Sequence, residues 1–273
     1  MGELVPESSS IDLHNSINLT KDSIVSLTEL VPRQIFLPPM LEKTSTKDLA
    51  SSRTKSLTSS VVFISSFDYT PHPPIEVGND SSLAALAISG SGLISDPYVL
   101  EGWKITTVGI HGIYIYDTTA HFVIRNCLIT TGNITDIHGI YIRNVSTGTI
   151  SIENNVCQNN FKGIFVQSSN KSSIGYNTCH KNSVGISLQY SGSSTVGNNI
   201  CYLNKHELRG GYGIHIEDSD YSTVTDNTCT QNNNVGIRFD IAKYSTIVNN
   251  TCHNNGRGIS LGGSEYSNVV NNK

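Results

Sequence analysis

The stretch Ile152-Glu-Asn-Asn-Val-Cys-Gln-Asn-Asn-Phe-Lys-Gly-Ile-Phe-Val166 decides the fold, because its pattern returns further along the chain. A second copy spans 174–188 and a third begins at position 196, so the cysteine of each copy follows the previous one by 22 residues. A fixed period of this length is typical of architectures in which each copy forms one structural unit and neighbouring copies stack.

Each copy contains two short segments with strand character. The phrase Gly-Ile-x-apolar alternates with period two, which predicts a strand with one buried face. The phrase Ile-x-x-Asn-x-Cys predicts a second short strand, bent at the asparagine, and no window shows apolar residues at helical spacing. About 22 residues therefore hold two or three short strands and their bends. That is one turn of a parallel β-helix, an all-β solenoid whose rungs lie roughly 4.8 Å apart.

Positions one period apart are expected to lie above one another, so that like residues form columns. The apolar columns are Ile140, Ile164, Ile186, Ile214, Ile237 and Ile259; Ile142, Val166, Leu188, Ile216, Phe239 and Leu261; and Ile152, Ile174, Val196, Val224, Ile247 and Val269. The asparagine columns are Asn155, Asn177, Asn199, Asn227, Asn250 and Asn272, and Asn160, Asn182, Asn204, Asn232 and Asn255. Stacked amides can hydrogen-bond their neighbours, and Asn tolerates the left-handed backbone that sharp bends need. The apolar columns argue against the disorder that an Asn-rich composition could otherwise indicate.

Glycine and cysteine also recur at fixed places. The glycine before each isoleucine, as at Gly163, is interpreted as the permissive residue where the chain turns into the next strand. The six cysteines are assigned to one buried column, and they are Cys127, Cys157, Cys179, Cys201, Cys229 and Cys252. No CxxC pair occurs, so a zinc knuckle is not indicated. Adjacent rungs would also be close enough for a disulfide, which leaves oxidation open beside the reduced ladder that we favour.

Composition excludes several classes of function. The formal net charge of −4 and the lack of a Lys/Arg cluster argue against nucleic acid as a partner. No run approaches the roughly 20 apolar residues of a membrane span, and no secretory signal is readable at the start. The chain ends within a repeat, and solenoids need terminal caps, so we expect a fragment with further coils or a domain after the last residue.

The chain divides into three predicted parts. Residues 1–60 form a Ser/Thr-rich segment that is expected to be flexible. Residues 61–104 are predicted to cap the solenoid with a strand at 75–77 and a short helix whose N-cap lies in Asp80-Ser81-Ser82. Residues 105–273 are predicted to form about seven coils of the β-helix, incomplete at the C-terminus.

The order of segments from Pro74 onward resembles that of a known family. It runs Pro74-Ile-x-Val, a short helix, Ser-Gly-Ser-Gly92, Asp96-Pro-Tyr-Val-Leu-Glu-Gly102, and then repeated Gly-Ile-x-Leu and Asn-Asn-x-Cys. This order resembles the NosD-like right-handed parallel β-helix family, whose members are described as periplasmic copper-binding proteins or as carbohydrate-binding and sugar-hydrolase modules. The resemblance implies the fold, its right hand, a place outside the cytoplasm, and a polysaccharide or glycan surface as partner. It is not specific for an activity, because pectate lyases and mannuronan epimerases look similar at this level.

Two residues of each Gly-Ile-x-apolar-x strand are expected to point outward. The first outward column is Tyr114, Tyr141, Phe165, Ser187, His215, Arg238 and Ser260, and the second is Tyr116, Arg143, Gln167, Gln189, Glu217, Asp240 and Gly262. By resemblance, this is the surface on which polysaccharide-active β-helices place their substrate. The early coils offer aromatic residues on which sugar rings could stack, so the substrate-binding candidates are Tyr114, Tyr116, Tyr141, Arg143, Phe165, Gln167 and Gln189.

The later coils bring acid, base and cation together, with His215 and Glu217 on one rung and Arg238 and Asp240 on the next. In a lyase or C5-epimerase, His215 would be the base, Arg238 would neutralise the substrate carboxylate, and Glu217 or Asp240 would be the acid or a metal ligand. The two carboxylates at about 5 Å could also serve a glycosidase. The plainer alternative is a solvated cluster of charges. Six extra residues between the third and fourth copies, around 205–211, favour function, because loops on a rigid scaffold commonly carry binding groups.

A metal site is the remaining candidate. His111 and His138 both precede glycine in the phrase His-Gly-Ile-Tyr-Ile, so their imidazoles are expected to stack. Two imidazoles suit copper or zinc but fall short of a full shell, and a divalent cation is the one cofactor that the sequence brings into view. The plainer reading is a pair of turn histidines. The sequence thus favours a carbohydrate-recognising or scaffold module over an enzyme or a metal protein.

Overall fold

The computed structural model describes residues 68–206 and 210–273, all within the compact unit Phe63–Lys273. The predicted flexible segment 1–60 and the start of the predicted cap, 61–67, lie outside the described residues, as do positions 207–209 of the added loop.

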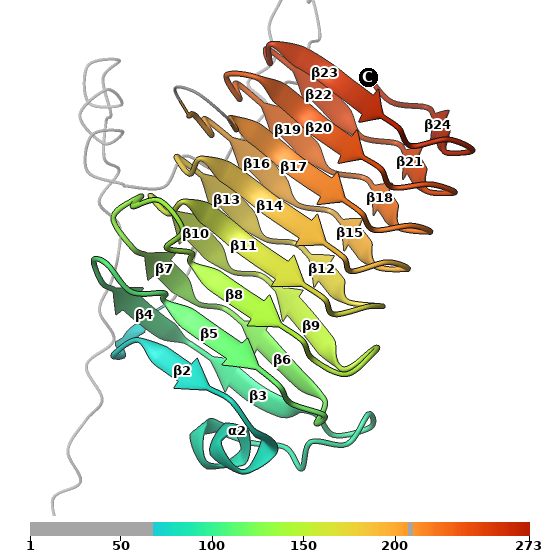
Figure 1. Cartoon of the computed structure of the whole chain (residues 1–273). Helices are drawn as coiled ribbons and strands as arrows, with labels where there is room; N and C mark the ends of the chain where they lie inside the picture. The colour runs from blue at the N-terminus through green and yellow to red at the C-terminus, as the bar shows by residue number, and fades with distance from the viewer. Residues whose placement is uncertain (1–67, 207–209) are drawn as a thin grey trace, which may run out of the picture. The chain divides into compact units, whose positions relative to one another are not determined.

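Within these residues the chain winds through three parallel β-sheets, A, B and C (Figure 1). Sheet A contains β1 (Thr70–Pro71), β4 (Trp103–Thr106), β7 (Leu128–Thr130), β10 (Val156–Gln158), β13 (Thr178–His180), β16 (Ile200–Tyr202), β19 (Thr228–Thr230) and β22 (Thr251–His253). Sheet B contains β2 (Ile75–Val77), β5 (Ile113–Tyr116), β8 (Ile140–Arg143), β11 (Lys162–Gln167), β14 (Val184–Gln189), β17 (Tyr212–Glu217), β20 (Val235–Asp240) and β23 (Arg257–Gly262). Sheet C contains β3 (Tyr98–Glu101), β6 (Phe122–Arg125), β9 (Ile150–Glu153), β12 (Ser173–Gly175), β15 (Thr195–Gly197), β18 (Thr223–Thr225), β21 (Thr246–Val248) and β24 (Asn268–Val270). The predicted all-β, right-handed parallel β-helix of about seven turns is confirmed.

The register of the strands places the predicted columns above one another. Ile164 pairs with Ile140 below and Ile186 above, and Ile174 pairs with Ile152 and Val196 in the same way. The inward residues of the three sheets form one continuous core, and most of them are fully buried. Burial on both sides by neighbouring rungs is what fixes the register, since a slip by one residue would turn each apolar side chain outward.

The cysteine column is confirmed except at its first member. Cys157, Cys179, Cys201 and the two later cysteines follow one another in register, with free thiols. Ile129, and not Cys127, pairs with Cys157. The Cys127 backbone N–H instead donates to Oδ1 of Asn155 at 3.0 Å, so Cys127 occupies the place below the first asparagine column. Its assignment to the ladder was therefore wrong by two residues.

The asparagine columns are hydrogen-bonded ladders inside the coil. Asn199, fully buried, donates from Nδ2 to Oδ1 of Asn227 at 3.0 Å and to two backbone carbonyls, and its Oδ1 accepts from the backbone and side chain of Asn177. The left-handed backbone falls on the residue before each ladder position, as at Asn198 with a φ of 57°. The ladder asparagine therefore satisfies buried polar groups at the bend, and its neighbour, which need not be Asn, makes the bend.

The glycines before the isoleucines serve close packing and not backbone freedom, which corrects the sequence interpretation. Gly163 and Gly185 lie inside strands and lack the left-handed φ. A Cβ at Gly185 would lie 2.5 Å from the carbonyl oxygen of Gly213 and 3.1 Å from Nδ2 of Asn204. The asparagine ladder thus occupies the space that a side chain would need.

Helix α2 (Asp80–Leu86) lies at the N-terminal end of the described coils (Figure 1). Its N-cap is Asn79, whose side chain accepts from the Ser82 N–H at 2.8 Å, and not a residue of the predicted Asp80-Ser81-Ser82. Asp80 instead accepts from the backbone N–H of Thr119 at 2.7 Å, which ties the helix to the turn after β5. Leu83 buries the apolar face of the helix against the core. The short capping helix is therefore present, held by a different residue than expected.

Candidate functional site

The outward face of sheet B carries both columns predicted to form the site. Their members follow one another as Cα partners on adjacent strands from β5 to β23, in the predicted order. Tyr114 thus pairs with Tyr141, and His215 pairs with Arg238. The sheet gathers every predicted catalytic and substrate-binding residue on one surface.

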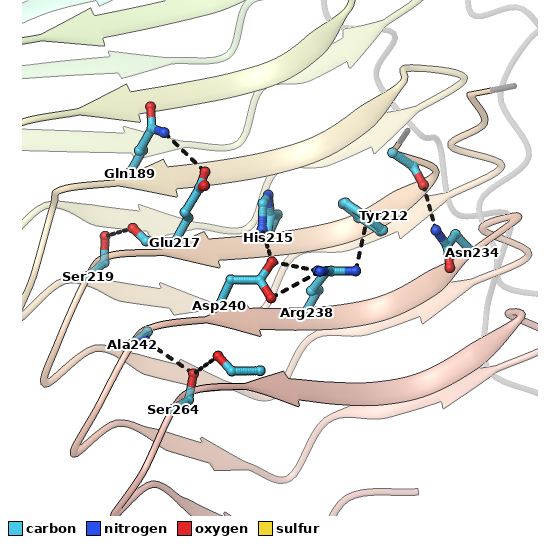
Figure 2. A network of polar contacts seen from close by, with 12 residues as sticks. Gln189, Tyr212, His215, Glu217, Ser219, Asn234, Arg238, Asp240, Ala242 and Ser264 are labelled. Atoms are coloured by element: carbon cyan, nitrogen blue, oxygen red, sulfur yellow. Dashed lines mark hydrogen bonds and ion pairs between the residues drawn. The ribbon is translucent and has the colours of Figure 1, made fainter. Parts of the chain in front are cut away.

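Asp240 is the centre of an ionic network between β17 and β20 (Figure 2). It accepts from Arg238 Nε at 2.5 Å and Nη2 at 3.0 Å, and its Oδ2 lies 2.9 Å from Nε2 of His215. Arg238 Nη1 also donates to the hydroxyl of Tyr212 at 3.3 Å. The guanidinium is therefore paired within the chain and is not a free cation awaiting a substrate carboxylate.

Burial and hydrogen bonding set the protonation of this network. Burial lowers the pKa of His215, whose side chain is 14% exposed, while its hydrogen bond with Asp240 opposes that effect. Burial alone would raise the pKa of Asp240, but hydrogen bonds from Arg238 and His215 hold it below its usual value. A neutral imidazole beside a carboxylate donates from the nitrogen that faces it, here Nε2. Nδ1 of His215 is then the basic nitrogen.

Glu217 belongs to a separate row of hydrogen bonds. The Tyr141 hydroxyl donates to Oε1 of Gln167 at 2.6 Å, Gln167 Nε2 donates to Oε1 of Gln189 at 2.9 Å, and Gln189 Nε2 donates to Oε2 of Glu217 at 3.1 Å. Glu217 and Asp240 are Cα partners, yet their carboxylates bond to different groups (Figure 2). Asp240, with its lowered pKa, does not offer the proton that a glycosidase acid needs.

The outward aromatic rings stack on one another along the solenoid axis. The Tyr114 and Tyr141 ring centroids lie 4.8 Å apart with 9° between planes, and those of Tyr141 and Phe165 lie 5.0 Å apart with 6° between planes. The ring of Tyr116 also stacks on Tyr114, at 4.6 Å. The faces that were expected to carry sugar rings are thus covered by neighbouring rings. What this column offers a ligand is its ring edges and hydroxyl groups.

His111 and His138 stack as predicted, with ring centroids 5.1 Å apart. Nδ1 of His111 accepts from the backbone N–H of His138 at 3.0 Å. His138 is 5% exposed and meets Tyr141 and Phe165 edge-to-face, and burial lowers its pKa to about 2. Its ring is therefore a packed, neutral member of an aromatic cluster, and its Nδ1 has no hydrogen-bond partner within 68–206 and 210–273.

Sequence reasoning missed Lys162 and Tyr212. The Lys162 ammonium lies 3.4 Å from the centroid of the Phe165 ring, and burial lowers the pKa of Lys162 to about 8. The Lys162 charge also lowers the pKa of His215, which places it within electrostatic reach of the network. The signal was readable, because the positions before the glycines form a further column: His111, His138, Lys162, Val184, Tyr212, Val235 and Arg257.

Residues 87–273 match the profile of a protein family described as "Periplasmic copper-binding protein (NosD)". The chain belongs to the NosD family. A search of curated proteins gave no significant match. The family profile covers the coils and the end of the cap, so the resemblance read from the sequence is confirmed.

This NosD-family chain is similar to several solved structures. One is the periplasmic alginate epimerase AlgG in mutant form, at 19% identity and a TM-score of 0.50, covering 64% of this chain and 45% of the epimerase. Another is the enzymatically active domain of bacteriophage CBA120 tailspike protein 2, at 14% identity and a TM-score of 0.48, covering 64% and 30%. A third is the A-module of mannuronan C-5 epimerase AlgE4 from Azotobacter vinelandii, at 13% identity and a TM-score of 0.44, covering 75% and 68%. The chain spans less than half the length of the AlgG structure that it matches.

The family's description implies copper, and the described residues do not fit it. Over 68–206 and 210–273, no group of three or more His, Cys, Asp or Glu side chains is placed to hold a metal ion. His111 and His138 supply two nitrogens at most, and one ring is enclosed by other aromatic rings. The cysteines lie in the core. In the same parts of the chain, no helix is long and apolar enough to cross a membrane.

Proposed function

We propose that the outward face of sheet B binds a polysaccharide, and that the protein works in the periplasm or outside the cell. The observation that carries the proposal is the row from Tyr141 through Gln167 and Gln189 to Glu217, in which each side chain is hydrogen-bonded to the next. Sugar hydroxyls both donate and accept, as amides, phenols and carboxylates do in combination. A row that repeats at the rung spacing matches a linear ligand lying along the solenoid axis.

The description of the family supports a place in the periplasm, but it does not identify a polysaccharide. NosD is described as periplasmic, and the AlgG structure with the same fold is that of an alginate epimerase. Alginate is therefore a sensible first probe. A pure scaffold, the alternative that the sequence also allowed, would leave the outward polar row without a ligand.

A second candidate function is proton abstraction from a uronate unit, as a lyase or C5-epimerase performs it. The observation that favours it is His215, which is held by Asp240, nearly enclosed, and biased towards its neutral form. A neutral imidazole in fixed orientation is a suitable base for the proton α to a carboxylate. Lys162, whose ammonium lies over the Phe165 ring within electrostatic reach of Glu217 and Asp136, replaces Arg238, which Asp240 already pairs, as the cation that would neutralise that carboxylate.

The binding proposal is tested by titrating alginate, polygalacturonate and a neutral glucan into wild-type protein and the Tyr141→Phe variant. Phe preserves the ring stack and removes only the hydroxyl that bonds to Gln167, so the fold should be unchanged. We expect wild-type binding to at least one polysaccharide and an affinity about three- to tenfold lower in the variant. Equal affinities of the wild type and the variant would show that the row from Tyr141 to Glu217 is not part of the binding surface.

The catalytic proposal is tested on the same polymers. Elimination produces an unsaturated uronate that absorbs in the ultraviolet, and epimerisation exchanges the C5 proton with solvent deuterium. We expect one of these signals in the wild type and its loss in His215→Ala. Product formation by that variant at the wild-type rate would remove His215 from the chemistry, and binding without either signal would leave recognition alone.

A further inference from the structure

A hollow of about 590 Å³ lies where sheet A passes into sheet B. Its lining residues are Asn133, Thr135, Phe161, Ser183, Lys205, His206 and Asn233. Most connections at this edge are short, such as 159–161 and 181–183, but the connections 131–139 and 203–211 are longer. Asn133 and Thr135 of the first long connection and Lys205 and His206 of the second line the hollow as two walls, and the short connections form a floor two rungs wide.

The walls are held in place by hydrogen bonds of their own. Ser183 Oγ donates to Oδ1 of Asn133 at 3.2 Å, which fixes one wall to the floor. Asn233 accepts at Oδ1 from the backbone N–H of His206 at 3.4 Å, and its Nδ2 donates to the His206 carbonyl at 3.3 Å. The hollow is therefore built before any ligand arrives, and its size lies within the usual range of small-molecule sites.

The floor is aromatic on one side. The Phe161 ring stacks on His138, with centroids 5.9 Å apart and 23° between planes, so only its other face is left for the hollow. His206 meets the same ring edge-to-face at 5.9 Å. Phe161 lines the hollow, so its ring supplies an aromatic surface against which the apolar side of a sugar ring can pack.

The rim is positively charged. Lys205 is exposed and lines this hollow, and it also lines an adjoining one of about 270 Å³ together with Lys181. Among the described residues that line the two hollows, none carries a carboxylate. Two ammonium groups around amides, hydroxyls and one aromatic ring suit a ligand that is both hydroxylated and anionic.

We propose that this hollow is a second sugar subsite, separate from the sheet B network, which binds an anionic sugar unit of the polysaccharide. The inference rests on the proposed function and adds where the charge of the ligand is recognised. Phe161 and Ser183 directly precede β11 and β14, so a sugar in the hollow lies at the beginning of these two strands. Lys162 is the first residue of β11, and β14 pairs with β17, the strand that carries His215. A chain anchored here continues towards the sheet B row.

The test compares Lys205→Ala with Lys104→Ala, a matched removal of an exposed lysine from β4 on sheet A. Calorimetric titration uses an oligouronate, a sulfated oligosaccharide and a neutral oligosaccharide of equal length. We expect Lys205→Ala to weaken oligouronate binding about five- to tenfold and to make it less sensitive to salt, and Lys104→Ala to stay within about twofold of the wild type. Tighter binding of the sulfated ligand would identify sulfate in place of carboxylate as the recognised anion.

Further variants separate the two sites. Phe161→Leu keeps an apolar side chain and removes the ring face, so it should weaken binding while its melting temperature serves as the check on folding. If Lys205→Ala and Phe161→Leu bind as the wild type does while Tyr141→Phe is weakened, the hollow is not a subsite and the sheet B proposal stands. If the first two are weakened and Tyr141→Phe is not, the hollow stands and the sheet B row fails. Preference for the neutral ligand would overturn the hollow as an anion site.

Discussion

Replacing His138 by Phe should make the protein less sensitive to acid. Burial among aromatic rings lowers the pKa of His138 to about 2, whereas a histidine in an unfolded chain titrates near 6.5. Between these two values the unfolded state binds a proton at this site and the folded state does not. Stability contributed by the neutral ring is therefore fully present above pH 6.5 and is lost as the pH falls.

The size of the effect follows from linkage. One proton of difference costs about 1.4 kcal/mol per pH unit, so moving from pH 6.5 to pH 5 removes roughly 2 kcal/mol at this one site. Phe retains the contacts of the ring with Tyr141, Phe161 and Phe165. It also removes Nδ1, which is buried without a partner, so stability at pH 7.5 should stay within about 1 kcal/mol of the wild type.

Urea unfolding at pH 7.5 and pH 5 measures this difference directly. The loss of stability between the two conditions should be about 2 kcal/mol smaller in His138→Phe than in the wild type, provided that both have the same urea slope. His180→Phe should show nearly the same difference between pH 7.5 and pH 5, and the two variants should separate only below pH 4, because burial lowers the pKa of His180 to about 4 and its contribution levels off below that pH. Equal acid sensitivity of wild type and His138→Phe would refute the reasoning, because it would mean that the buried ring takes up a proton in the folded state.

Three further changes test the ladder, the packing and the network. Asn199→Ala leaves buried ladder donors without an acceptor, so it should lower the free energy of unfolding in urea by about 2–4 kcal/mol. As the control, Asn198→Gly changes the exposed residue beside it and should alter that free energy by less than about 1 kcal/mol. Gly185→Ala places a Cβ 2.5 Å from the next rung's carbonyl oxygen and should lower the melting temperature by several degrees or prevent folding, which expression and circular dichroism will show. Asp240→Asn removes the carboxylate that raises the pKa of His215, so that pKa should fall further in an NMR titration; a rise would contradict the assigned cause.

The repeat made the inward half of the structure predictable. A position such as Ile164 has a counterpart above and below, and only one register buries all of them, so sequence spacing alone was sufficient. The prediction failed at Cys127, where the first rung carries an isoleucine at the ladder position two residues later. The interpretation of Gly163 as a turn residue was also wrong. A glycine that is required for close packing against the asparagine ladder looks the same in sequence as one that is required for a turn.

The side-chain chemistry of the site was less predictable than its location. The column pattern placed His215, Arg238 and Asp240 on neighbouring rungs, but it did not predict that Asp240 would be the common partner of the other two. That choice depends on side-chain rotamers and on contacts such as those of Tyr212 with His215 and Arg238, which no spacing rule specifies. For the same reason the stacking of Tyr141 between its neighbours, which covers both faces of its ring, was not foreseen.

The outward columns change chemical class where the inward columns do not, and this contrast is the strongest reason to place function on sheet B. Ile164, Ile186 and Ile214 repeat one residue along the core, because every rung must fill the same space. Their outward neighbours pass from Phe165 through Ser187 to His215. Packing requirements alone do not explain why this column changes from an aromatic ring to a hydroxyl group and then to an imidazole. The buried Oγ of Ser187, which has no hydrogen-bond partner, marks the rung at which the stacked rings end and the polar network begins. Under the proposed function, the expected ligand spans both parts of the face, with apolar edges on one side of that rung and charges on the other.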